Sequence, residues 1–216
     1  MKRTLFLLVL CLLVLPTVVN AQVTGVTGNA TLVPPPSSVE TGTGAAESIV
    51  FAEQSLVLSS PINVDISGPG AYNSVASLTP ATIAAGTDVS SFYLHSWNST
   101  DLSGTVYSGS ITFATPILGV EALSSSLPAT NSVLGLPTTT YFTGAVGQGF
   151  EFGTQIDSLT ISGDTLSFLN ETFNAPDDLR IITSAAAAPT PEPSILLMLG
   201  SGLLALVGLN LKKSLA

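Results

Sequence analysis

The sequence predicts an all-β fold, a single β-sandwich of the jelly-roll or Greek-key type. From Gln22 onward, the 216-residue chain is rich in Thr, Ser, Val, Gly and Pro, its apolar stretches are short, and turn formers recur about every ten residues. Two packed sheets are favoured over a closed barrel because the predicted strands are uneven in length and their apolar runs are partly alternating and partly continuous. We therefore expect one domain, from Gln22 to Ala188.

Eight segments have the apolar pattern expected of strands. In chain order they are Glu47–Leu58, Ser90–Trp97, Thr105–Thr115, Ile117–Leu123, Thr139–Val146, Asp157–Ser162, Thr165–Leu169 and Leu179–Ser184. The strongest prediction is a hairpin, because apolar and polar residues alternate on both sides of Gly163-Asp164. A glycine in the first loop position favours a type II′ turn. Predicted turns elsewhere include Leu127-Pro128 and Asn174-Ala175-Pro176-Asp177.

The first 21 residues have the three parts of a secretory signal peptide. Lys2-Arg3 gives a positive start, Leu5–Leu15 is an almost uninterrupted apolar run, and Val19 and Ala21 are small residues placed for cleavage. Removal of residues 1–21 would also remove the only cysteine of the chain. We expect a mature protein without a disulfide or a thiolate ligand.

The other end carries a proline-rich stalk, an apolar segment and a basic tail. Three prolines within residues 189–194 exclude helix and sheet pairing there. Residues 195–211 follow as an apolar run, which as a helix of 17 residues is about 25 Å long and just sufficient to cross a membrane. Lys212 and Lys213, within the final residues 212–216, favour the cytoplasmic side and place the preceding domain outside.

This tail resembles the PEP-CTERM sorting signal of Gram-negative bacteria, which membrane exosortases process. The resemblance covers Pro191-Glu192-Pro193, the short hydrophobic span and the closing pair Lys212-Lys213. It implies export, transient anchoring by the C-terminal helix, and removal of the tail near the prolines. It also implies an exosortase-type enzyme as partner, and deposition at the cell surface or in the extracellular polysaccharide matrix.

The charges and the reactive residues exclude several classes of function. Residues 22–188 hold 13 of the 14 acidic residues but only one of the five basic ones, Arg180, so nucleic acids and nucleotides are not expected as partners. His95 is the only histidine and no Gly-x-Ser-x-Gly is present, which argues against a hydrolase triad and against a zinc or copper site. We expect no enzyme, no metal site and no cofactor.

Two alternatives concern the acidic residues. A glycan hydrolase would need two carboxyl groups about 5 to 9.5 Å apart, and the sequence leaves pairs among Glu121, Glu151, Asp157 and Asp164 open. Calcium is the second alternative, because acidic loops can supply oxygen ligands. The acids considered for it are Asp157, Asp164, Asp177 and Asp178. Ordinary solvated acidic side chains are the simpler expectation.

The remaining candidate is an aromatic stripe on one predicted strand. Strand alternation places Tyr93, His95 and Trp97 on the same face, where they would suit stacking on sugar rings if that face were open. The simpler expectation is that these large residues pack in or over the core. The main hypothesis is therefore an exported, non-catalytic protein of the cell surface or matrix, with a carbohydrate-binding module as the alternative and exopolysaccharide as its ligand.

Overall fold

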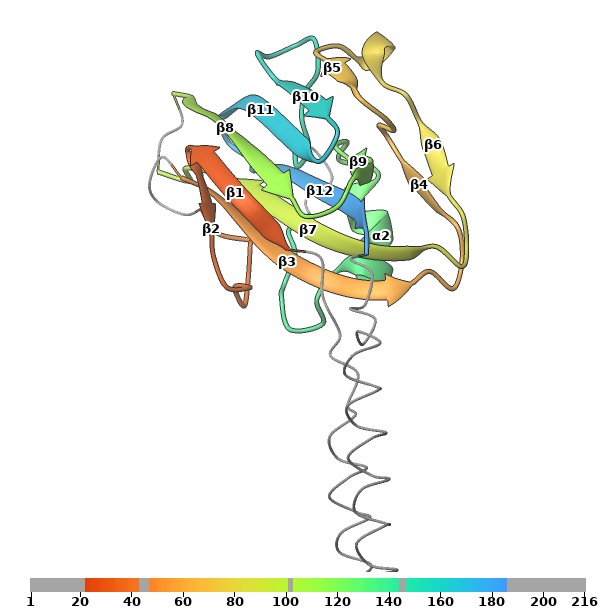
Figure 1. Ribbon diagram of the computed structural model, residues 1–216. Coiled ribbons are helices and arrows are strands. Elements are labelled where there is room, and N and C mark those ends of the chain that lie inside the picture. Colours follow the sequence, from red (N-terminus) through yellow and green to blue (C-terminus); the bar gives the residue numbers. More distant parts are fainter. Residues whose placement is uncertain (1–21, 43–46, 101–102, 144–146, 186–216) are drawn as a thin grey trace, which may run out of the picture. The chain divides into compact units, whose positions relative to one another are not determined.

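The computed structural model describes residues 22–42, 47–100, 103–143 and 147–185 (Figure 1). Strands make up most of the regular structure in these segments. The strands are β1 (Val23–Gly28), β2 (Ala30–Leu32), β3 (Ser48–Val57), β4 (Ile62–Val64), β5 (Gly70–Tyr72), β6 (Ala81–Ile83), β7 (Asp88–Ser96), β8 (Thr105–Phe113), β9 (Ile117–Glu121), β10 (Ser158–Ser162), β11 (Thr165–Thr172) and β12 (Asp177–Ser184). A 3-10 turn (Val75–Ser77) and one α-helix, α2 (Leu127–Leu134), complete these segments. The all-β prediction is confirmed.

The predicted features of the two chain ends lie outside the described residues. They are the signal peptide (1–21), the stalk (189–194) with Pro191, Glu192 and Pro193, the apolar span (195–211), and the tail (212–216) with Lys212 and Lys213. Within the described segments, no helix is both long enough and apolar enough to span a bilayer.

Two five-stranded sheets lie face to face. The first has the order β1-β8-β11-β10-β5 and the second the order β2-β3-β7-β12-β9, while β4 and β6 form a separate two-stranded ribbon. Every pairing between these strands is antiparallel except that of β2 with β3. The chain crosses between the two sheets repeatedly, for example from β7 to β8, from β8 to β9 and from β11 to β12 (Figure 1).

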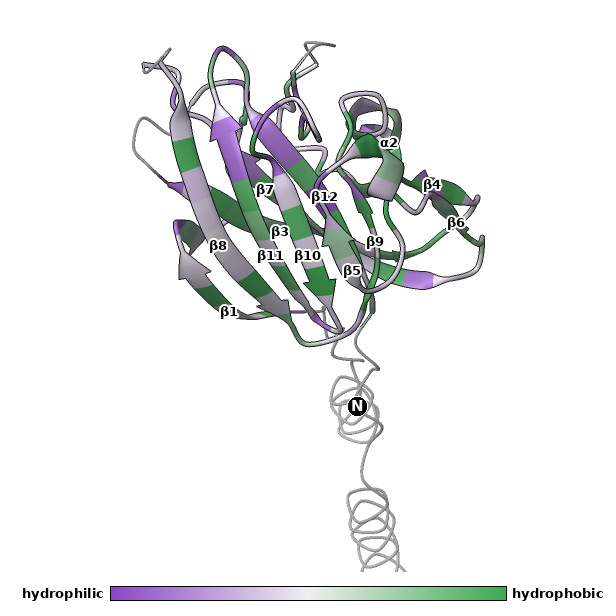
Figure 2. Cartoon of the chain, turned by 90° about the horizontal axis from the view of Figure 1, so that it is seen from above, coloured by the Kyte–Doolittle hydropathy of each residue, from purple (hydrophilic) through white to green (hydrophobic). Residues whose placement is uncertain are grey.

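Alternating apolar residues fill the space between the sheets. Figure 2 shows the alternation as bands of hydrophobic and hydrophilic residues along the strands of the first sheet. Phe92 of the second sheet and Phe113 of the first meet across the interface, with ring centroids 4.8 Å apart. The other buried residues of this core include Val50, Leu94, Tyr107, Ile111, Val120, Leu159, Ile161, Leu166, Phe168, Leu179 and Ile181.

The second sheet is covered on its outer face as well. Nearly every residue of β7 and β12 is buried, whichever face it occupies. Over the outer face, Phe51 and Tyr93 pack with Val39, Leu127 and Tyr141 from α2 and the loops. The molecule thus has a third, partial layer over the middle of this sheet.

One buried arginine joins α2 to the second sheet. Arg180 of β12 is fully buried, and its Nε and Nη2 donate to the two carboxylate oxygens of Glu53 at 2.8 and 3.0 Å. A β-bulge between Ala52 and Ser55 interrupts the β3–β7 register at Glu53. The other N–H groups of Arg180 donate to α2, at the Leu127 carbonyl, the Thr130 hydroxyl and the Asn131 side-chain oxygen, and Nη1 also donates to Glu121 Oε2 at 3.4 Å.

All predicted strands but one overlap a strand of the structure. The exception is Thr139–Val146, of which residues 139–143 contain no strand and residues 144–146 are not described. Tyr141 packs edge-on against Tyr93, with centroids 5.1 Å apart, and its hydroxyl accepts the backbone N–H of Leu136. These apolar residues are buried because they belong to a loop that covers the second sheet.

The hairpin prediction is confirmed. β10 and β11 pair from Ser158 with Leu169 to Ser162 with Thr165. Gly163 has a φ of +64°, and no described non-glycine residue has a positive φ, so the loop fits a type II′ turn, whose second residue has a negative φ.

Replacing Gly163 with alanine is expected to lower the free energy of unfolding by about 1 to 2 kcal/mol, because a Cβ is unfavourable in the left-handed region. A Cβ would have nothing within 4 Å there, so the loss would come from backbone strain alone. Gly25→Ala is the control, since Gly25 lies outside that region and its Cβ would make only an ordinary contact, at 3.8 Å, with Thr112. Equal losses for both variants in urea unfolding would contradict the prediction.

Candidate functional site

The predicted aromatic stripe is not a surface feature. Tyr93 and His95 are 0% and 1% exposed, because the outer face on which they lie is covered by the third layer. Trp97 is partly exposed, and its ring meets that of Phe142 with centroids 6.1 Å apart. Two of the three residues are therefore not accessible to a sugar ring, which corrects the hypothesis of a sugar-binding stripe.

Tyr93 and His95 instead belong to a buried polar network around Asp178. Asp178 Oδ2 accepts the Tyr93 hydroxyl at 2.9 Å, and Oδ1 lies 2.7 Å from His95 Nδ1. Gln148 completes the network by donating from Nε2 to the Tyr93 hydroxyl at 3.2 Å. His95 Nε2 is buried without a hydrogen-bond partner in the described part of the chain, so no serine there completes a hydrolase triad.

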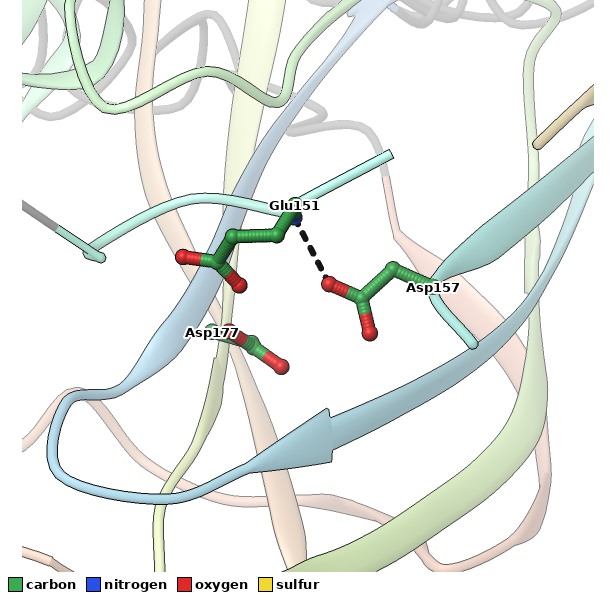
Figure 3. Close-up of side chains that lie close together, drawn as sticks. All are labelled: Glu151, Asp157 and Asp177. Atoms are coloured by element: carbon green, nitrogen blue, oxygen red, sulfur yellow. Dashed lines mark hydrogen bonds between the residues drawn. The ribbon is translucent and has the colours of Figure 1, made fainter. Parts of the chain in front are cut away.

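Three carboxylates gather at one end of the sandwich, and we call them the acidic cluster. Glu151, Asp157 and Asp177 each place a carboxylate oxygen within 4.8 Å of the others. Figure 3 shows the three side chains converging from separate segments. Glu151 lies in a loop, Asp157 directly precedes β10, and Asp177 begins β12. The cluster therefore joins elements of both sheets.

Strand geometry and backbone hydrogen bonds position these carboxylates. Asp177 occupies the same face of β12 as Leu179, which is in the core, so its side chain points between the sheets. Asp157 accepts backbone N–H groups through both carboxylate oxygens, from Glu151 at 2.7 Å and from Glu171 at 3.1 Å. Its side chain is thus fixed before any ligand binds.

A cavity of about 240 Å³ borders the cluster. Glu151 and Asp177 contribute to its wall, and so does Gln155, whose Nε2 donates to Glu151 Oε2 at 3.2 Å. The other lining residues are Gly147, Glu171, Phe173, Asn174 and Ala175. The cluster is therefore next to a space that can hold water or a small ligand.

The electrostatics of the cluster disfavour three ionised carboxylates. Burial, and then the charge of Asp157, raise the pKa of Glu151 to about 7. Burial, followed by the charge of Asp157, also raises the pKa of Asp177 well above its ordinary value. Burial raises the pKa of Asp157 against the opposing effect of the hydrogen bonds from the backbone at Glu151 and Glu171. Perturbed carboxyl groups beside a cavity mark a candidate site.

The structure sorts the acids that the sequence singled out. Of those considered for calcium, Asp157 and Asp177 meet, whereas Asp164 is exposed in the hairpin turn and Asp178 lies in the network with His95. Of those considered for glycan hydrolysis, Glu151 and Asp157 meet as part of one tight cluster instead of facing each other across a cleft. Asn170 and Gln155, the two amides that contact the cluster, are not among the site residues that the sequence predicts.

Comparison of the chain with models of protein families, with curated proteins and with solved structures finds no match in any of the three.

Proposed function

We propose that the protein is an exported, non-catalytic component of the cell surface or extracellular matrix, sorted by its C-terminal tail. The observation that carries the proposal is the order of the tail, with Pro191-Glu192-Pro193 before an apolar span and Lys212-Lys213, in a chain whose residues 1–21 have the pattern of a signal peptide. An exosortase-type membrane enzyme is the processing partner, and the C-terminal helix anchors the chain until it is cleaved.

The acidic surface and the sandwich fold of the domain support this proposal. Arg180 is the only basic residue in the described segments and is fully buried, so their charged surface groups are acidic. Such a surface repels nucleic acids and other polyanions. The sandwich is of the jelly-roll type in this proposal. The successive strands β7 and β8 lie in different sheets, and the successive strands β12 and β11 lie beside them, β12 next to β7 and β11 next to β8.

The intact mass of the protein from the membrane and from the medium tests the proposal in a Gram-negative host that has an exosortase. We expect a chain that starts at Gln22, ends near Pro191–Pro193 and lies outside the membrane. Replacing Pro191, Glu192 and Pro193 with alanine is expected to leave the anchored form, at least tenfold enriched in the membrane fraction. Pro189→Ala, in the same stalk but outside the motif, is the control and should be processed normally.

A wild-type mass that retains residues 195–216, found only in the membrane fraction, would contradict the sorting proposal. It would indicate a permanently anchored external domain. Equal processing of the triple variant and the wild type would also contradict it, because cleavage would then not depend on the Pro-Glu-Pro motif.

A further inference from the structure

The acidic cluster has no positive partner within the described protein. Arg180 is the only basic side chain there, and its N–H donors are used by Glu53, by Glu121 and by three groups of α2. His95 is also engaged elsewhere, because it bonds Asp178. Three adjacent carboxylates that are largely buried need a positive charge close by when they are ionised. A cation from solution can supply that charge.

A fully buried amide side chain faces the cluster from β11. Asn170 is 0% exposed, and its Nδ2 donates to Asp177 Oδ2 at 2.9 Å. Its Oδ1 is buried and has no hydrogen-bond partner among the residues described. An amide oxygen that is buried without a hydrogen bond lowers the stability of the folded protein. A half-turn of the amide group would present Oδ1 to the cluster in place of Nδ2, and amide oxygens are common calcium ligands.

Gln155 repeats this arrangement from another segment. Its Nε2 donates to Glu151 Oε2 at 3.2 Å, while its Oε1 is buried without a partner in the described segments. Two amides from different parts of the chain thus each direct an N–H at a cluster carboxylate and leave the oxygen unpaired. The 240 Å³ cavity beside Gln155 has room for water molecules as further ligands.

We propose that this end of the sandwich binds one Ca²⁺ ion, through the carboxylates of Glu151, Asp157 and Asp177 and the amide oxygens of Asn170 and Gln155. All five donors are hard oxygens, and with water they reach the six to eight ligands that Ca²⁺ prefers. Mg²⁺ is less suited, because it requires a strict octahedron and retains most of its water. The ion would tie β11 of the first sheet to β12 of the second. This proposal does not depend on the sorting of the tail.

Calorimetric titration and thermal unfolding of the full chain, purified in detergent and freed of metal with EGTA, test the site. We expect one Ca²⁺ per chain with a Kd of about 10⁻⁴ to 10⁻³ M, the range of extracellular modules. At a hundredfold excess over Kd, the melting temperature should rise by about 5 °C or more. MgCl₂ at the same concentration should produce less than half of that shift.

Asp177→Asn separates cation binding from a structural role. It should weaken Ca²⁺ binding at least tenfold, yet in EGTA its melting temperature should equal or exceed that of the wild type, because an uncharged amide removes a source of repulsion among neighbouring acids. Asp164→Asn, at the exposed hairpin turn, is the matched control and should bind Ca²⁺ normally. If Asp177→Asn does not fold, Glu151→Gln takes its place with the same expectation.

The absence of a Ca²⁺-dependent heat and temperature shift in the wild type would overturn the proposal, even if neither variant folded. An equal loss of binding in Asp164→Asn and Asp177→Asn would overturn it as well, since the ion would then only screen surface charge. Binding is measured on the purified chain, so a failure of tail processing leaves this test unaffected.

Discussion

Replacing Arg180 with methionine is expected to lower the free energy of unfolding at pH 7 by about 3 to 5 kcal/mol, as removal of one partner from a buried ion pair does. Methionine matches much of the volume but none of the charge. Glu53 would lose both of its hydrogen bonds from the guanidinium, and Glu121 would lose the positive charge that lies 3.4 Å from its Oε2. Glu53 would then be a buried acid that keeps the hydrogen bond from the Ser91 hydroxyl but has no positive charge beside it.

The helix α2 would lose its attachment at the same time. Arg180 donates to its first-turn carbonyl at Leu127 and to the side chains of Thr130 and Asn131. The guanidinium also lies over the rings of Tyr93 and Tyr141, 5.2 and 5.4 Å from their centroids, where cation–π attraction adds to the packing. The variant should therefore show increased hydrogen exchange in residues 127–134 as well as reduced global stability.

Urea unfolding of two companion variants distinguishes charge from packing. Ile182→Met changes the next residue on the same face of β12 and should cost less than about 1.5 kcal/mol. Combining Arg180→Met with Glu53→Gln and Glu121→Gln should recover part of the loss, because no buried acid is then left without the guanidinium. A triple variant no more stable than Arg180→Met would show that packing, not charge, is responsible.

Period-two alternation predicted the strands of the core well, because a strand between two apolar layers must alternate or be continuously apolar. It failed where a third layer covers the sheet. The sequence shows that Phe92 and Tyr93 make both faces of β7 apolar, but it does not show what covers the outer face. The cover comes from Tyr141 and Gln148, about fifty residues further along the chain. Local pattern carries no information on such distant contacts.

The helix α2 shows how a correct signal can be misinterpreted. Leu127-Pro128 predicted a turn, yet the structure places Pro128 in the first turn of the helix, where its missing N–H costs nothing. Ser126 precedes the helix and Gly135 follows it. Proline just inside a helix and glycine just beyond it are a recognised pair of boundary signals. The segment is short and surrounded by strands, so the turn interpretation was the more obvious one.

The acidic cluster was partly predictable. The predicted strand begins only at Leu179, whereas β12 begins at Asp177, so Asp177 and Asp178 lie on opposite faces of the strand and the structure separates them. The hairpin prediction placed Asp164 at the far end of β10 from Asp157, which excludes a shared ion. The approach of Glu151 and Asn170 depends on how the loop and the two sheets pack, and no local pattern encodes that.

Replacing Glu121 with glutamine is expected to leave stability almost unchanged at pH 5 and to raise it at pH 9, by at most about 5 kcal/mol. Glu121 is fully buried. Its Oε2 accepts the Thr130 hydroxyl at 2.5 Å, but its Oε1 has no hydrogen-bond partner within the described segments. Burial outweighs the attraction of Arg180 and raises the pKa of Glu121 from 4.5 to about 8.

The sign of the effect follows from that raised pKa. The folded protein holds the proton of Glu121 more tightly than the unfolded chain does, so this contribution to stability is complete below about pH 4.5 and is lost as the pH rises through about 8. Glutamine mimics the protonated acid and does not titrate. Denaturant unfolding at pH 5, 7 and 9 should thus give a variant-minus-wild-type difference that grows with pH. The acidic cluster titrates alike in both proteins and cancels from this difference.

Glu53→Gln is the contrasting variant, because Glu53 and Glu121 share one buried cation but are not equivalent partners. Glu53 receives two hydrogen bonds from Arg180, at 2.8 and 3.0 Å, whereas Glu121 receives one at 3.4 Å. The two-point contact makes Glu53 the main partner of the guanidinium, whereas Glu121, with its pKa raised to about 8, keeps a proton near neutral pH. Glu53→Gln should therefore destabilise the protein at pH 7. Equal destabilisation by both variants at pH 9 would mean that Glu121 is ionised and paired, contrary to this assignment.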